Sequence, residues 1–400
     1  MLRIIYGRAG SGKTSFCFNE IKDKIKNSEK IYIITPEQFS YTAEKHLMEI
    51  IDEKANMNAE ILTFDRMAYR VFQEIGGSKR VALSDCGIAM LLYDILDKEK
   101  KKLTFLGKTS KNVNVVSRLF TELNKHKVED SKIKELIENT EDTYLKLKLK
   151  DILILREALR NRMPSNYMEN TNKLNLLAEK LEYSNMFNDA IIYLDEFAGF
   201  TKQEYDIIEN ILKKAKQVNV TVCTDCIEYE SNIETDIFYE NKQTAVKLIE
   251  LAKKVDVGVE PSVQLKTSFR FKSSEIAHLE QNIFNLDYEK YEKDAENLEL
   301  FLAMNPYSEI EYIAQKIVYL VRENNFRYRD IAVITKNIDC YSTIASTVFK
   351  QYDIPVFIDQ KRDLNSNILV QFLLAIFDII IKNWSYEAVF NYLKTGLTRN

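Results

Sequence analysis

The chain is poor in the residues that break or cross-link a fold. Its 400 residues include only 10 glycines, 5 prolines, 5 cysteines, 3 histidines and 1 tryptophan. So few glycines and prolines argue against a disordered or low-complexity chain. Five scattered cysteines predict buried reduced thiols, and Cys223 and Cys226 have no second pair nearby to complete a zinc site. The composition therefore predicts an ordered protein without a disulfide framework.

Long apolar runs are also missing. None approaches the ~20 residues of a membrane span, and the apolar stretch after Arg3 is too short for a secretory signal. We therefore expect a cytoplasmic protein with no membrane contact. With 56 lysines and arginines against 60 aspartates and glutamates, the net charge is −4. This balance neither supports nor excludes a nucleic-acid partner, because basic grooves can be local.

Three of the ten glycines stand together near the N-terminus. The segment 7–14 reads GRAGSGKT, which satisfies the G-x-x-x-x-G-K-[ST] pattern of a P-loop. An apolar strand-like run (2–6) precedes it, and helical spacing follows over about 12–25. In this context backbone N–H groups surround phosphates, the lysine reaches the β- and γ-phosphates and the threonine can bind Mg²⁺. The predicted ATP-binding residues are Gly7, Arg8, Ala9, Gly10, Ser11, Gly12, Lys13 and Thr14.

A second strand-like run, 190–194, ends in the acidic pair Asp195 and Glu196. A P-loop ATPase needs one carboxylate for Mg²⁺ and another to orient or deprotonate the attacking water. We assign Asp195, together with Thr14, to the metal and Glu196 to the water. The sequence thus predicts a Mg²⁺-dependent ATP site with Asp195 and Glu196 as its catalytic residues.

Strand and helix patterns alternate on both sides of a long helical block. Strand-like segments occur before residue 65 and again at 190–194 and 218–223, whereas 84–184 reads as Lys-, Glu- and Leu-rich helices. After Pro261 a second alternation begins, with strand-like segments at 298–304, 330–335 and 354–359. We predict an α/β fold in three parts. They are a parallel-sheet P-loop domain (1–80 plus 186–261), an all-helical insertion (81–185) and an incomplete second α/β domain (262–400).

These blocks resemble superfamily-one DNA helicases of the UvrD/Rep type. They resemble more closely the N-terminal part of the AddB family, the B subunits of ATP-dependent helicase/deoxyribonucleases of Gram-positive bacteria. The resemblance rests on GRAGSGKT, ITPEQFSYTAEKHLM, LTFDRMAYRVFQEIGG, YLDEFAGFTKQEYDIIE and a long stretch from Ser308, and it covers essentially the whole chain. It implies RecA-like domains and a heterodimer with an AddA-type subunit that translocates on DNA. It also implies a nuclease domain with a 4Fe–4S cluster beyond residue 400, so we assign no cysteine to that cluster.

The resemblance adds candidate residues for both ligands. Phe269 and Arg270 stand where the superfamily has an adenine-stacking aromatic and an arginine that contacts the γ-phosphate. The superfamily contacts single-stranded DNA at positions that correspond here to 38–40, to 64–69 and to the residue beside the acidic pair. Aromatic rings there can stack on bases, although Phe64 and Tyr69 fit equally well as core residues of an amphipathic helix. The candidate DNA-binding residues are Gln38, Ser40, Phe64, Arg66, Tyr69 and Phe197, with Phe39 in the same segment.

One position departs from the active relatives. Glu228 stands where they have a glutamine that senses the γ-phosphate, and a carboxylate would repel that group.

The resemblance as a whole implies one subunit of a helicase/exodeoxyribonuclease that processes double-strand DNA ends for homologous recombination. It would bind ATP and single-stranded DNA and recognise Chi without motor activity of its own, while retained Glu196 leaves ATP hydrolysis open. Two alternatives are an autonomous superfamily-one helicase and an architectural partner-binding protein with a relict P-loop.

Overall fold

The computed structural model describes residues 1–26, 29–50, 58–76, 81–106, 112–164, 166–169, 172–227, 236–285, 287–360 and 364–398. The chain divides into two compact units, Met1–Asn297 and Leu298–Asn400. The first unit extends past the expected domain boundary at residue 261, because a short strand that follows this boundary joins the first sheet.

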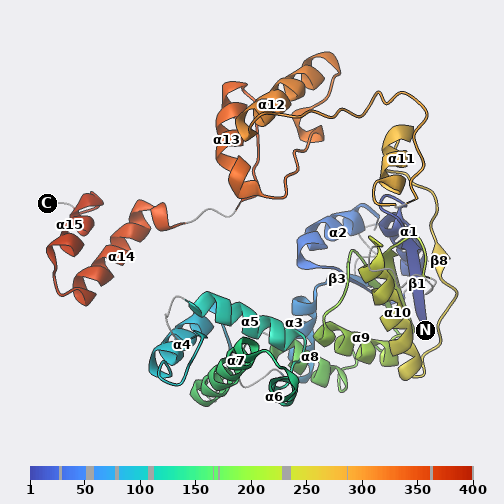
Figure 1. The fold of residues 1–400 in the computed structure, drawn as a ribbon. Helices are drawn as coiled ribbons and strands as arrows, with labels where there is room; N and C mark the ends of the chain where they lie inside the picture. The colour runs from blue at the N-terminus through green and yellow to red at the C-terminus, as the bar shows by residue number, and fades with distance from the viewer. Residues whose placement is uncertain are drawn as a thin grey trace. The chain divides into compact units, whose positions relative to one another are not determined.

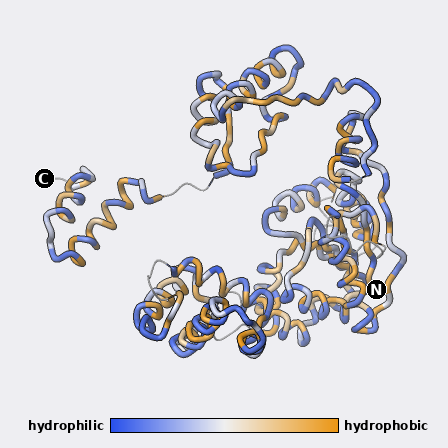
Figure 2. The backbone as a smooth tube through the Cα atoms, viewed as in Figure 1, coloured by the Kyte–Doolittle hydropathy of each residue, from blue (hydrophilic) through white to orange (hydrophobic). Residues whose placement is uncertain are grey.

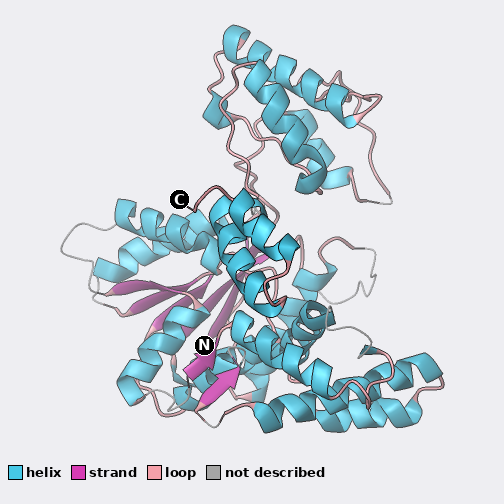
Figure 3. Ribbon diagram, turned by 90° about the vertical axis from the view of Figure 1, so that its left-hand side faces the viewer, coloured by secondary structure: helices cyan, strands magenta, loops and turns pink. Residues whose placement is uncertain are grey.

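A six-stranded parallel sheet forms the centre of the first unit, with helices on both faces (Figures 1 and 3). The predicted α/β fold with a parallel sheet is therefore confirmed. The strands Ile31–Ile34 and Ile191–Leu194 are buried at every residue, as expected for a sheet covered on both sides. The strand order is β3 (Ala59–Leu62), β2 (Ile31–Ile34), β6 (Ile191–Leu194), β7 (Gln217–Cys223), β1 (Leu2–Gly7) and β8 (Val263–Gln264).

Alternate residues of the strands feed two separate hydrophobic cores. In β1, Ile4 packs into one core and Ile5 into the other, because successive side chains of a strand point to opposite faces. The core around Ile5 is completed by α1 (Lys13–Lys26) and α2 (Glu37–Ile50). The core around Ile4 is completed by α3 (Phe64–Ile75), α8 (Asn172–Leu181), α9 (Lys202–Lys214) and α10 (Tyr239–Lys254). This layering holds the carboxyl ends of β1, β6 and β7 at one edge of the sheet.

The insertion has a hydrophobic core of its own, centred on residues such as Leu92, Phe120 and Leu155. Its helices are α4 (Asp85–Lys98), α5 (Val113–Lys125), α6 (Asp130–Asn139) and α7 (Thr143–Arg162). The expectation of an all-helical insertion missed two strands, β4 (Val81–Leu83) and β5 (Tyr167–Glu169), which pair in parallel. Three residues are too few to show a strand's alternating pattern in the sequence.

The second unit contains α12 (Pro306–Glu323), α13 (Ile338–Gln351), α14 (Ile368–Ile381) and α15 (Tyr386–Lys394). The three segments predicted as strands there do not form strands within residues 298–360. A strand needs ladder partners and burial of its apolar face, whereas Leu300, Ile334 and Phe357 are 100%, 91% and 88% exposed. Figure 2 shows that apolar residues also run along α14.

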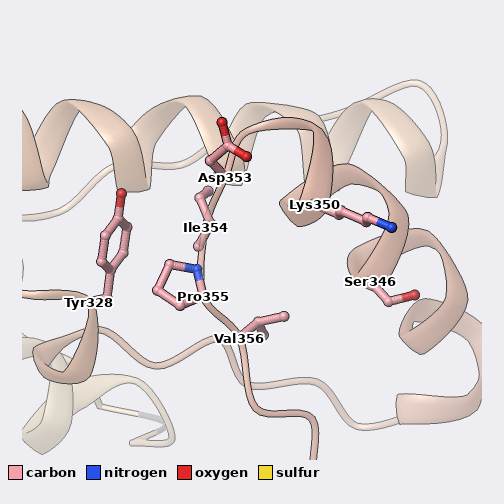
Figure 4. Close-up of a pocket in the computed structure, with 7 residues that line it drawn as sticks. All are labelled: Tyr328, Ser346, Lys350, Asp353, Ile354, Pro355 and Val356. Atoms are coloured by element: carbon pink, nitrogen blue, oxygen red, sulfur yellow. The ribbon is translucent and has the colours of Figure 1, made fainter.

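A cavity of about 560 Å³ opens on the second unit between the end of α13 and the segment that follows it (Figure 4). No residue predicted to bind ATP or DNA lines this cavity. All of the predicted binding residues belong to the first unit. Its lining is Tyr328, Ser346, Lys350, Asp353, Ile354, Pro355 and Val356. Across the described ranges, we find no helix with the length and apolar character needed to cross a bilayer.

Candidate nucleotide and DNA-binding site

The GRAGSGKT segment forms the loop between β1 and α1. Gly10 and Gly12 have φ angles of +76° and +80°, in the left-handed region that glycine tolerates best. A Cβ on Gly7 would lie 2.5 Å from the carbonyl oxygen of Leu265. The hydroxyl of Ser11 is buried and has no hydrogen-bond partner among the described residues. A tight glycine loop with an unpaired buried hydroxyl fits a phosphate cradle.

Two side chains at the start of α1 turn back toward the loop and the sheet edge. Lys13 donates from Nζ to the carbonyl oxygens of Gly7 at 2.9 Å and Arg8 at 3.0 Å. Thr14 donates from Oγ1 to Oε1 of Glu196 at 3.0 Å. The first-turn N–H groups of a helix have no intrahelical acceptor, so α1 adds donors for an anion at the same place.

The acidic pair follows β6 at the same edge of the sheet. Asp195 is only 3% exposed, and its Oδ1 accepts a hydrogen bond from the Thr221 hydroxyl of β7. Glu196 has a φ of +66°, a conformation that costs about 1–3 kcal/mol in a residue other than glycine. This left-handed residue carries the carboxylate that Thr14 contacts. Such backbone strain is common at functional sites.

The structure contains no cluster of three or more His, Cys, Asp or Glu side chains suited to a metal within the described ranges. A Mg²⁺ ion bound together with ATP does not require one, because phosphates and water supply most of its ligands. Thr14 and buried Asp195 offer the hydroxyl and carboxylate oxygens that Mg²⁺ prefers. Thr14 and Asp195 therefore suit the predicted Mg²⁺ ion.

Phe269 and Arg270 lie against the P-loop. The Phe269 N–H donates to the carbonyl oxygen of Gly10 at 2.9 Å, and its ring is 71% exposed beside Gly12. A Cβ on Gly10 would lie 2.4 Å from Cβ of Arg270. β8 produces this contact, since it pairs with β1 and directs the following segment back over the loop.

The side chain of Arg8 points to other protein groups. It donates from Nε to Oε1 of Glu280 at 2.9 Å and from Nη2 to the Glu280 carbonyl oxygen at 2.8 Å. Glu280 belongs to α11 (Ser274–Asn282), and the Arg8 guanidinium also lies 5.0 Å from the centre of the Phe238 ring. The Arg8 guanidinium is thus held by protein groups, and the Arg8 carbonyl oxygen accepts from Lys13. Glu280 and Phe238 could not be predicted from the sequence, because no local pattern links them to the P-loop.

The candidate DNA residues divide into exposed and packed groups. Gln38 is exposed at the start of α2, where the Ser40 hydroxyl donates to the carbonyl oxygen of Glu37 at 2.9 Å. Arg66 and Tyr69 are exposed on α3. This helix is capped by Thr63, whose hydroxyl accepts a hydrogen bond from the backbone N–H of Arg66.

Phe64 belongs to the hydrophobic core and is 8% exposed. Its ring meets Phe197 edge-on, with 5.7 Å between ring centres, and Phe197 packs on Phe200 at 4.8 Å. A ring buried in this way has no face open to a base. The structure therefore favours the core alternative for Phe64 and leaves Tyr69, 61% exposed, as the aromatic available on α3.

An open cavity of about 550 Å³ lies beside this exposed face of α3, lined by Glu60, Asp65, Arg66, Tyr69 and Arg70. All three charged side chains of α3 there are ion-paired with neighbouring elements. Arg66 pairs with Glu44 of α2, Arg70 with Glu60 of β3 at 2.8 Å, and Asp65 with Lys173 of α8 at 2.6 Å.

The position expected to sense the γ-phosphate, Glu228, lies outside the described residues. Just before it, Asp225 follows β7 and pairs with Lys242 of α10 at 2.9 Å. Lys242 also pairs with Asp236. Burial alone would raise the pKa of Asp225, but its hydrogen bond with Lys242 and the charge of that lysine hold the pKa below its usual value.

This chain is similar to proteins of one family. Residues 4–280 match the family model described as ADDB, N-terminal. The B subunit of the ATP-dependent helicase/deoxyribonuclease of Clostridium kluyveri (strain NBRC 12016) is 41% identical over 405 residues, covering 99% of this chain and 35% of the relative. The proteins of the same name from Clostridium tetani (strain Massachusetts / E88) and Thermoanaerobacter sp. (strain X514) are 41% and 39% identical, again over 99% of this chain and 36% and 35% of theirs.

The chain thus spans about a third of the length of these curated relatives. The family model alone covers residues 4–280, well over half of the chain, and includes the P-loop, the acidic pair and α11 as far as Glu280. The chain belongs to the AddB family and corresponds to its N-terminal part.

Proposed function

We propose that this chain is the ATP- and single-strand-binding part of the B subunit of an ATP-dependent helicase/deoxyribonuclease. The observation that carries the proposal is the Thr14–Glu196 hydrogen bond of 3.0 Å, which brings the P-loop helix and the acidic pair together at one sheet edge. The names of the relatives support the same assignment.

In this proposal the loop backbone and Lys13 bind the phosphates of ATP, and Phe269 and Arg270 approach the nucleotide from the segment after β8. Thr14 and Asp195 hold Mg²⁺, which when bound neutralises charge on the phosphates. Glu196 is placed to accept a proton from water. Thr221 fixes the buried carboxylate of Asp195 through its hydroxyl.

Single-stranded DNA would pass over the exposed starts of α2 and α3. Gln38 and Ser40 offer polar contacts, Tyr69 an exposed ring for stacking and Arg66 a guanidinium for a base edge. In a cytoplasmic heterodimer with an AddA-type subunit, this surface would recognise Chi while double-strand ends are processed for homologous recombination. Phe197 and Phe64 would support the surface from beneath.

We propose further that the nucleotide shapes this protein and that the partner drives translocation. The test is ATP turnover, with and without single-stranded DNA, by the full-length protein assembled with a partner whose own P-loop lysine has been removed. We expect Lys13-dependent ATP binding without DNA-stimulated turnover, comparing Lys13 with Lys13→Ala. DNA-stimulated turnover that disappears in Lys13→Ala would instead show a second working motor. Absence of ATP binding would favour an architectural protein with a relict P-loop.

A further inference from the structure

Two ion pairs on α3 are equally exposed to solvent. Arg66 pairs with Glu44 of α2, and the two side chains are 52% and 36% exposed. One turn along the helix, Arg70 pairs with Glu60 of β3, with side chains that are also 52% and 36% exposed. Tyr69 lies on the same helix, 61% exposed, and Arg66, Tyr69, Arg70 and Glu60 line one cavity. The two pairs differ in which arginine is held and in the element that supplies the carboxylate.

We propose that Glu44 is a positioning residue that gives Arg66 its preference for particular bases. This inference rests on the proposed function of Arg66 in contacting single-stranded DNA. A guanidinium presents five N–H donors in a rigid planar fork. Because Glu44 accepts a hydrogen bond from Nη1, it occupies one part of this fork and favours one orientation of the guanidinium plane.

Glu44 also changes the electrostatics of the contact. A free arginine attracts any DNA phosphate, and this attraction carries no sequence information. A carboxylate beside the guanidinium offsets that attraction, while the remaining N–H donors can still meet acceptors on a base edge. Glu44 should therefore weaken binding to DNA in general and sharpen the choice among sequences.

Stability gives no competing reason for the pair. Ion pairs as exposed as Arg66–Glu44 contribute little to folding, because water screens them and both side chains lose freedom. The same holds for Arg70–Glu60, which makes that pair a matched control. If Glu44 were only an ordinary surface partner, neutralising Glu44 and neutralising Glu60 would have the same effects.

The experiment uses the full-length protein assembled with its partner and a pool of single-stranded DNA oligonucleotides of random sequence. Total affinity for the pool is measured at low and moderate salt, and the retained DNA is sequenced to obtain the enrichment of each short sequence. Glu44→Gln is compared with Glu60→Gln, Arg66→Ala and the unchanged protein. Unchanged urea-unfolding midpoints establish that each variant is folded.

We expect Glu44→Gln to raise affinity for the whole pool about two- to tenfold at low salt and to reduce the largest enrichment by a similar factor. Glu60→Gln should raise affinity with unchanged enrichment, and Arg66→Ala should remove the enrichment. If Arg66→Ala removes it but Glu44→Gln leaves it intact, the role of Glu44 is overturned while the proposed function stands. If the unchanged protein enriches no sequence, the role of Glu44 and the proposed function of this surface in sequence recognition both fail.

Discussion

The Thr14 hydroxyl donates a hydrogen bond to the Glu196 carboxylate over 3.0 Å, between residues 182 positions apart in the chain. It joins the first turn of α1 to the loop after β6. Parallel pairing through β7 makes this possible, because β1 and β6 both pair with β7 and end at the same edge of the sheet. A group proposed to bind Mg²⁺ thereby lies in direct contact with the group proposed to activate water.

Glu196→Gln should separate ATP binding from any ATP hydrolysis. The amide oxygen can still accept from Thr14, but the side chain can no longer take a proton from water. We expect ATP affinity to stay within about twofold and any Lys13-dependent turnover to fall by about 10²-fold or more. Binding of a fluorescent ATP analogue and phosphate release measure the two effects. Loss of binding equal to that in Asp195→Asn would contradict the separate roles.

Gly10→Ala should impair nucleotide binding as well as stability. The left-handed φ of +76° costs an alanine about 1–3 kcal/mol, and its Cβ would also meet Cβ of Arg270 at 2.4 Å. Gly76→Ala is the matched control, since its φ is +92° but nothing lies within 4 Å of the added atom. We expect only Gly10→Ala to lower ATP affinity, by at least about tenfold. Equal affinities in the two variants would argue against packing of Arg270 on the loop.

Phe64→Ala should lower stability and Tyr69→Ala should weaken DNA binding, although both remove an aromatic ring from α3. Phe64 is buried, so its loss should lower the free energy of unfolding by about 3–5 kcal/mol. Tyr69 is exposed, so its loss should change stability by less than about 0.5 kcal/mol and weaken single-stranded DNA binding by about 1–3 kcal/mol. Urea unfolding and fluorescence anisotropy distinguish them. Normal DNA affinity in Tyr69→Ala would remove the stacking role.

Arg8 and Glu280 should be coupled in stability but not in ATP binding. Each side chain is about a quarter exposed, and together they form charge-assisted hydrogen bonds between the P-loop and α11. We expect Arg8→Ala and Glu280→Ala each to lower the free energy of unfolding by about 1–2 kcal/mol, with a double-mutant coupling of about 1 kcal/mol. ATP affinity should change less than about threefold, because the loop backbone binds the phosphates. Additive losses would show that the pair is not formed.

Lys242→Met should destabilise the protein in a pH-dependent way. Burial alone would lower the pKa of Lys242, but hydrogen bonds with Asp236 and Asp225 raise it above its usual value. We expect a loss of roughly 1 kcal/mol at pH 7, since solvent screens Asp225, which is 42% exposed. The ion pair requires ionised Asp225, whose folded-state pKa is lowered.

The difference between Lys242→Met and the unchanged protein should therefore be constant from about pH 5 to 9. It should shrink as the pH falls below the unfolded pKa of Asp, about 3.9, and through the lower folded value. It should also shrink as the pH rises through the raised pKa of Lys242. Urea unfolding at pH 7 and in acid measures this change. A difference that grows in acid would be inconsistent with the ion pair.

Features that depend on neighbouring residues could be predicted from the sequence. The P-loop, the strand ending at Asp195 and the helices of the insertion all have local signatures, because glycine φ angles, apolar runs and helical spacing act over a few residues. The parallel sheet followed from alternating strand and helix patterns. These parts of the fold and the residues of the loop could be predicted before the structure.

Contacts between distant residues, by contrast, depend on how the sheet and helices pack. Phe64 and Tyr69 share a helix and an aromatic character, and only the packing of that helix on the sheet buries Phe64 and leaves Tyr69 exposed. Arg8 and Glu280, like Arg66 and Glu44, are partners with no sequence signature. Leu300 and its neighbours have a strand-like pattern but no ladder partner within residues 298–360. Side-chain contacts between distant segments depend on how sheet and helices pack, and local propensity does not specify them.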